Sequence, residues 1–169
     1  MHPEPIRHHY IPQFILRNFC DNRNQRYYYD KQTQCISVKD TRDVFMERNL
    51  YRDEINHITD PVKIECDLAA YEREITPIIK NRFLTERDIF ITPEEDEKIK
   101  LFFAIMGFRS LNAKHSLKHW KIPNENPLTM WKRNLGNIVQ CRSFEEVMNH
   151  PRIDVNCPNL CGQYKNTPM

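Results

Sequence analysis

Glycine is scarce in this chain of 169 residues, which contains only Gly107, Gly136 and Gly162. No two of them lie close together, so the glycine-rich loops that cradle phosphates in P-loop and dinucleotide-binding proteins are absent from the sequence. This excludes nucleotide binding through either kind of loop.

Long apolar runs are missing as well. The longest, residues 101–108, is far shorter than the ~20 residues that a membrane-spanning helix requires. Residues 1–5 lack the apolar stretch of a signal peptide. The composition, with 40% hydrophobic and 28% charged residues, is typical of a globular domain. We therefore expect a soluble, cytoplasmic protein without a membrane partner.

The charges nearly balance, with 25 Lys and Arg against 23 Asp and Glu. Residues 111–169 carry eight basic and four acidic side chains, which leaves residues 1–110 with 17 and 19. This polarity suits contact with a nucleic acid or an acidic protein surface, and a chance distribution gives it equally well. Charge alone therefore does not select the partner.

The first fifty residues predict a short helix and a small sheet. Within residues 9–20, apolar side chains at 11, 14, 15 and 19 line one helical face, and Pro12 suits the first turn. The aromatic run at 25–30 and the alternating run at 35–39 flank a polar stretch, which predicts a β-hairpin. Residues 45–51 indicate a further strand or an edge segment.

Two longer helices are predicted next. The first begins near Asp60 and extends to Ile79, with Pro77 expected to kink its end. The second begins with a capping box formed by Thr92 and Glu95 and should extend to about Trp120. We expect an α+β fold in which the hairpin or small sheet packs on the two long helices.

Prolines at 123, 127, 151 and 158 divide the rest of the chain into short pieces. Asn126-Pro127 opens one short helix, and a capping box beginning at Ser143 opens another. We see no apolar pattern that would attach this irregular segment to the body. The predicted organisation is a core domain at 1–121 and a C-terminal segment of short helices and loops at 122–169, packed on the core.

Residues 9–19 read HYIPQFILRNF and resemble the N-terminal signature HYxPQFxLRNF of an uncharacterised bacterial family of unknown function. The resemblance extends to about Ala113 and implies a fold rather than an activity. Longer members continue into a second half with a Ser-Asp-Asn-Pro block, which is not found here, so the chain is expected to be an abbreviated member. The weaker matches are Tyr27 to Asp30, Asn49 to Tyr51, and a helix with acids at Glu65, Glu72 and Glu74.

A zinc site is predicted around Cys157 and Cys161, which are separated by three residues and followed by Gly162. Two thiolates at this spacing can coordinate one Zn²⁺ ion from a tight turn. Four protein ligands would make the site structural, and it would tie the C-terminal segment to the body. The alternative is two free thiols in a loose tail. The remaining ligands would be either Cys141 and His150, or His115 and His119, which share one helical face.

A catalytic interpretation centres on His9, with Asp30 or Glu72 as its carboxylate. In that case the protein would be a metal-dependent hydrolase. The simpler interpretation, which we favour, is a histidine at the entry to a helix that is held by packing.

Two segments are candidate binding surfaces. Tyr27, Tyr28 and Tyr29 lie near Arg23 and Arg26 and could stack on single-stranded nucleic acid, although strand alternation should bury at least one tyrosine. A denser cluster at the end of the second long helix is the predicted partner-binding patch, unless it is a solvated helix end. It consists of Lys114, Lys118, Trp120 and Lys121.

The leading functional hypothesis is a non-enzymatic interaction protein with a structural zinc ion. Its partner would be a protein, such as a nucleic-acid-bound nuclease, and direct nucleic-acid contact is an additional option. A concrete version is an anti-CRISPR-like inhibitor of a host defence nuclease, encoded by a phage or mobile element. The alternatives are a metal-dependent nuclease of a toxin or defence system, and an antitoxin-like DNA-binding protein.

Overall fold

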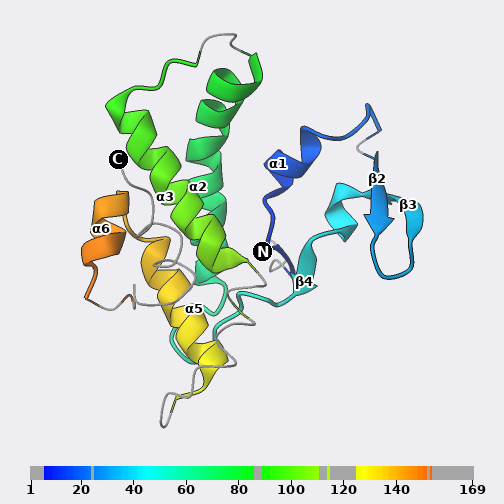
Figure 1. The fold of residues 1–169 in the computed structure, drawn as a ribbon. Coiled ribbons are helices and arrows are strands. Elements are labelled where there is room, and N and C mark those ends of the chain that lie inside the picture. The colour runs from blue at the N-terminus through cyan, green and yellow to red at the C-terminus, as the bar shows by residue number, and fades with distance from the viewer. Residues whose placement is uncertain are drawn as a thin grey trace. The chain divides into compact units, whose positions relative to one another are not determined.

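The computed structural model describes residues 6–23, 25–85, 89–110, 114, 125–151 and 153. The chain divides into two compact units, residues 1–50 and 51–169. It combines helices with two small antiparallel sheets (Figure 1), so the predicted α+β class is confirmed. The predicted boundary after residue 121 lies outside the described residues.

The first unit contains two antiparallel strand pairs. β2 (Gln25–Asp30) and β3 (Cys35–Asp40) form the predicted hairpin. β1 (Arg7–His9) pairs with β4 (Met46–Arg48), which confirms a strand in the segment after the hairpin. The ends of this unit therefore meet in one sheet.

The N-terminal helix is shorter than predicted. α1 covers only Gln13–Arg17, because His9 belongs to β1 and Pro12 is the N-cap residue. Aromatic rings connect the strand pairs. The ring of Phe45 lies 5.8 Å from that of Tyr10 and 5.5 Å from that of Tyr28, measured between centroids. The hairpin is thus held to the segment that leads into β4.

The second unit is helical. α2 (Lys63–Ile79) continues into a π-helical segment (Lys80–Thr85), and α3 (Pro93–Arg109), α5 (Pro127–Ile138) and α6 (Phe144–Asn149) follow. α3 packs against α2, α5 and α6, and α5 also packs against α2. No helix within the described ranges has the length and apolar character needed to cross a membrane. The helices enclose buried side chains that include Ile64, Leu68, Ile75, Leu101, Ile105, Trp131, Leu135, Ile138 and Val147.

α3 and α6 each begin directly after the capping residue that the sequence predicted. The Thr92 hydroxyl accepts from the Glu95 amide at 3.2 Å, and the Glu95 carboxylate accepts from the Thr92 amide at 3.0 Å, which confirms the capping box of α3. Ser143 caps α6 by accepting from the Glu146 amide at 3.1 Å. The Glu146 carboxylate, however, accepts from the amide of Arg142 rather than from that of Ser143.

Two expectations about the helices were wrong. α3 ends at Arg109 rather than near Trp120, because Ser110 takes an extended conformation with ψ 148°. The C-terminal segment also has an apolar attachment over 127–149, since Met130, Trp131 and Leu135 are buried. The indole of Trp131 donates to the carbonyl of Phe108 at 2.8 Å, which fixes α5 on the end of α3. Apolar contacts and this hydrogen bond therefore contribute to holding the segment that was expected to depend on a bound ion.

Candidate functional site

The N-terminal signature forms a short chain of side-chain contacts. β1 places His9 in a buried position, and the side-chain amide of Gln13 lies 3.2 Å from its Nε2 atom. The guanidinium of Arg17 donates to the Gln13 amide oxygen at 3.0 Å. The spacing of four residues in the signature therefore aligns three polar side chains, and this favours a structural role for His9.

Asp30 lies elsewhere, at the loop end of the hairpin, and is exposed. Its carboxylate accepts hydrogen bonds from the amides of Gln32 at 2.8 Å and Thr33 at 3.3 Å, and these bonds lower its pKa. His9 and Asp30 thus belong to different strand pairs, and each has local partners. The structure does not place them as an acid–base pair.

Two of the predicted zinc ligands are described. Cys141 is buried and donates to the carbonyl of Asn137 at 3.4 Å, whereas His150 follows α6. Burial, with a smaller contribution from Glu146, raises the pKa of Cys141 to about 11. Among the described residues, no three His, Cys, Asp or Glu side chains form a metal-binding group.

The other predicted ligands, Cys157, Cys161, His115 and His119, lie outside the described residues. So do Lys118, Trp120 and Lys121 of the predicted partner-binding patch. Lys114 is described, and its amide donates to the carbonyl of Ser110 at 3.3 Å. The zinc site and this patch stay predictions.

A buried ionic cluster joins α2, α3 and the start of the second unit. The Arg109 guanidinium donates to the Glu72 carboxylate at 2.5 Å and to the Tyr51 hydroxyl at 3.1 Å. Arg109 and Tyr51 are both buried. Glu65, two turns before Glu72 on α2, has a buried carboxylate oxygen without a hydrogen-bond partner. The cluster combines two carboxylates with one cation.

The environment of Glu65 makes it titrate near neutrality. Burial raises its pKa to about 7, with a lowering contribution from Arg109 and a raising one from Glu72. A buried carboxylate prefers its neutral form. The spaced acids of this helix are visible in the sequence, but no sequence signal identified Arg109 as the partner of Glu72, which lies 37 positions away.

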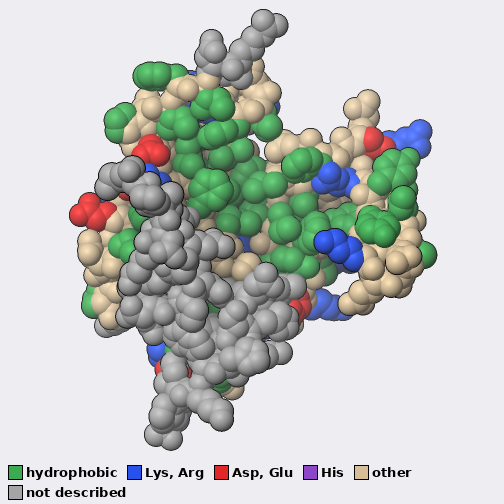
Figure 2. Space-filling model, viewed as in Figure 1, with side chains coloured by type: hydrophobic (Ala, Val, Ile, Leu, Met, Phe, Trp, Pro, Cys, Tyr) green, Lys and Arg blue, Asp and Glu red, His purple; other side chains and the backbone are tan. Residues whose placement is uncertain are grey.

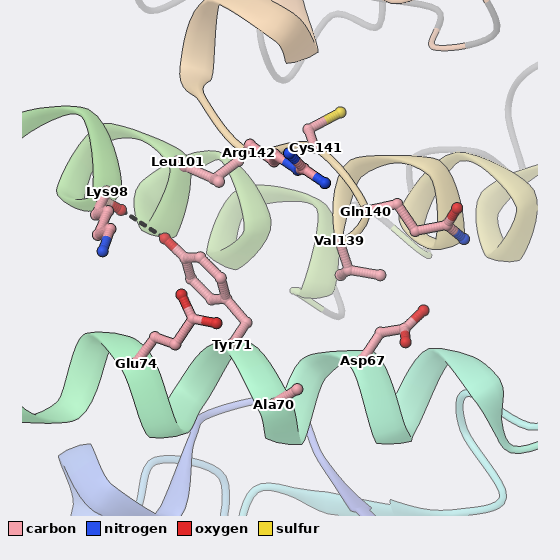
Figure 3. A pocket seen from close by; sticks show the side chains of 10 residues that line it. All are labelled: Asp67, Ala70, Tyr71, Glu74, Lys98, Leu101, Val139, Gln140, Cys141 and Arg142. Atoms are coloured by element: carbon pink, nitrogen blue, oxygen red, sulfur yellow. Dashed lines mark hydrogen bonds between the residues drawn. The ribbon is translucent and has the colours of Figure 1, made fainter. Parts of the chain in front are cut away.

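A groove of about 470 Å³ lies between α2, α3 and the connection from α5 to α6 (Figure 3). Asp67 and Glu74 stand on the α2 side, and Lys98 and Arg142 on the opposite side. The side chain of Tyr71 extends from α2 across the groove, and its hydroxyl donates a hydrogen bond to the carbonyl of Lys98 at 2.5 Å. Asp67 pairs with Lys63, and Lys98 with Glu94. The groove therefore carries charges of both signs, and ion pairs neutralise some of them. This lining does not indicate a particular class of ligand.

The hairpin exposes large apolar side chains on one face. Tyr27 is 83% exposed and Tyr29 59%, and the opposite strand contributes Ile36 at 70% and Val38 at 51%. The register pairs Tyr27 with Val38 and Tyr29 with Ile36, so the four side chains form one patch, here called the hairpin face. Tyr28 packs on Phe45 instead, so strand alternation separates it from its two neighbours.

The segment that forms the hairpin is basic overall. The segment 21–42 carries five basic and three acidic side chains, whereas the rest of the chain carries 20 of each. Figure 2 shows blue basic side chains beside green hydrophobic ones over this part of the molecule. The basic residues are Arg23, Arg26, Lys31, Lys39 and Arg42, and the acidic ones are Asp21, Asp30 and Asp40.

Comparison with known proteins places the chain in a family. A family model matches residues 7–148. The chain belongs to the family described as Protein of unknown function (DUF4238). As a member of DUF4238 it shares more than the N-terminal signature, because the match extends past Ala113 through α5 and into α6. No curated protein and no solved structure matches the chain.

Proposed function

We propose that this protein is a non-enzymatic interaction protein that binds a macromolecule through the hairpin face. The supporting observation is the exposure of Tyr27, Tyr29, Ile36 and Val38 side by side. Contiguous exposed apolar patches are uncommon on monomeric proteins and mark interaction surfaces. Aromatic side chains contribute strongly to such interfaces because they bury a large area with few rotatable bonds.

The hydrolase alternative requires His9 to act as a base or a metal ligand. Its contact with Gln13 and its position in β1 support a structural role instead. The Asp30 carboxylate is similarly used by the amides of the hairpin loop. These placements support binding over hydrolysis as the proposed function.

The narrower form of the proposal is inhibition of a host defence nuclease. A basic, partly aromatic hairpin suits a nuclease with its nucleic acid bound, because the bound nucleic acid exposes phosphates. Adding the full chain to candidate defence nucleases, with cleavage as the readout, tests this form directly.

The binding function is tested with two double variants of the full chain. Ile36→Ser/Val38→Ser removes half of the hairpin face. Ile58→Ser/Phe90→Ser removes two side chains of comparable exposure in the second unit. Each protein is purified from host lysate, and the protein and nucleic acid that it retains are identified and quantified.

We expect the unmodified chain and the second variant to retain a stoichiometric partner, and the hairpin variant to lose at least nine-tenths of it. Equal retention by all three proteins would contradict the proposal. Cleavage of DNA or RNA with Mg²⁺, Mn²⁺ or Zn²⁺, abolished by His9→Ala, would establish the hydrolase instead.

A further inference from the structure

We propose that the hairpin face binds single-stranded nucleic acid, with Tyr27 and Tyr29 stacking on bases. This inference rests on the proposed function and names its ligand class. Sheet surfaces that carry exposed aromatic side chains are a recurrent way to bind unpaired bases, because every base presents a flat face for stacking.

The spacing of the two tyrosines fits stacked bases. Tyr27 and Tyr29 are two residues apart on one strand face, so their Cβ atoms lie roughly 6.8 Å apart. Successive bases along one strand are separated by about 3.4 Å. The two rings can therefore enclose one base or each stack on a base of the same strand. Their exposure of 83% and 59% leaves the ring faces available.

The second strand supports the rings. Val38 lies directly opposite Tyr27, and Ile36 directly opposite Tyr29. Side chains in such cross-strand pairs have Cβ atoms roughly 5 Å apart and contact each other. The aliphatic groups thus restrict the rings from one side and add apolar surface for the sugar of a bound nucleotide.

The charges around the face favour a polyanion over an apolar protein surface. Lys31, in the hairpin loop, and Arg23, just before β2, are exposed near opposite ends of the tyrosine strand. The nearby acidic groups accept hydrogen bonds from main-chain amides. The Asp21 carboxylate accepts hydrogen bonds from the amides of Arg23 and Gln25, and the Asp30 carboxylate from those of Gln32 and Thr33. The Asp40 carboxylate accepts one from the amide of Arg42. A phosphate backbone along β2 would meet basic groups at both ends.

The test measures binding of the full chain to labelled 12-nucleotide oligo(dT), oligo(U) and a DNA duplex by fluorescence anisotropy. We expect the single strands to bind more tightly than the duplex. Tyr27→Ser should weaken single-strand binding about 5- to 150-fold, the range expected for losing one stacked base. Tyr27→Phe keeps the ring and should stay within about twofold, and Ile58→Ser, outside the face, should change nothing.

Salt dependence supplies a second readout. If about two phosphates are neutralised, the logarithm of the association constant should fall with the logarithm of salt concentration with a slope of about −1.4. Lys31→Gln should reduce that slope, whereas Tyr27→Ser should weaken binding and leave it unchanged. Circular dichroism of each variant verifies that it is folded.

Three outcomes would overturn the inference. The first is that the chain binds no oligonucleotide at micromolar protein concentration. The second is that single strand and duplex bind equally and Tyr27→Ser has no effect. The third is that the chain self-associates and Ile36→Ser abolishes this, which would make a second copy the occupant of the hairpin face. If the chain binds no oligonucleotide but retains a protein partner that depends on Ile36 and Val38, the nucleic-acid inference is wrong and the proposed function stands. If it binds neither an oligonucleotide nor such a protein partner, the inference and the proposed function are both wrong.

Discussion

Arg109 on α3 and Glu72 on α2 form a hydrogen-bonded ion pair at 2.5 Å, with the arginine side chain only 3% exposed. The same guanidinium donates to the Tyr51 hydroxyl and lies 5.5 Å from the centre of its ring. A single cation therefore connects two helices to the first residue of the helical unit. It is also the charge that offsets the carboxylates of this region.

Replacing Arg109 by methionine should destabilise the protein by about 3–5 kcal/mol, because the largely buried Glu65 and the half-buried Glu72 would both lose the nearby cation. Arg42→Met removes a guanidinium from an ion pair with Asp40 in which the arginine side chain is 72% exposed. That control should cost much less, because solvent screens an exposed ion pair. Urea unfolding measures both free energies, and equal losses would show that the Arg109 pair is no stronger than a surface pair.

Glu65 should make stability depend on pH between about 4.5 and 7. The folded chain keeps the proton up to a pKa of about 7, whereas the unfolded chain releases it near 4.5. Since the folded state binds more protons in this window, the free energy of unfolding should fall as pH rises through it, by about 3 kcal/mol at most.

Glu65→Gln isolates this effect from other titrating groups. The variant should match the unmodified chain near pH 4.5 and become progressively more stable than it up to pH 7.5. A difference between the two proteins that stays constant over this range would mean that the Glu65 pKa is not raised by folding.

Local patterns predicted the elements better than the contacts between them. The tyrosine run, the alternating strand at 35–40 and the Thr92–Glu95 capping box each involve neighbours in sequence, and each appears in the structure. Ser110 ended α3 earlier than the apolar pattern indicated, since a helix stops where one residue leaves helical dihedral angles.

The buried features were harder to predict. The side chains of Met130, Trp131, Leu135 and Ile138 recur at helical spacing, and their burial shows that this spacing, rather than the flanking prolines, indicates how the segment is attached. The partnership of Arg109 with Glu72 depends on how α3 packs on α2, and a single sequence does not contain that information. The hairpin face was foreseen only as a tyrosine cluster, because pairing with Ile36 and Val38 depends on register.

Three of the cysteines that the structure describes, Cys35, Cys66 and Cys141, should react with a maleimide in a definite order relative to one another. Cys35 is exposed and should be labelled first. Cys66 is also exposed, but partial burial and nearby carboxylates raise its pKa, which lowers its thiolate fraction and slows labelling. Cys141 is buried with a pKa of about 11 and should be labelled last. Mass spectrometry of peptides from the native protein at pH 7.5 gives the order, and early labelling of Cys141 would contradict its burial.

Zinc, if the C-terminal cysteines bind it, should be present at one equivalent and should contribute little to the stability of α5 and α6. Trp131, Leu135 and Val147 are buried within the helical unit, so apolar contacts hold these helices. Elemental analysis should therefore show zinc lost in Cys157→Ser and retained in Cys141→Ser, whose sulfur already donates to Asn137. Chelation should leave the main thermal transition within a few degrees of its original midpoint. A metal-free purified protein would make the zinc prediction wrong, and a large drop in midpoint on chelation would show that the ion, rather than the apolar contacts, holds the C-terminal helices.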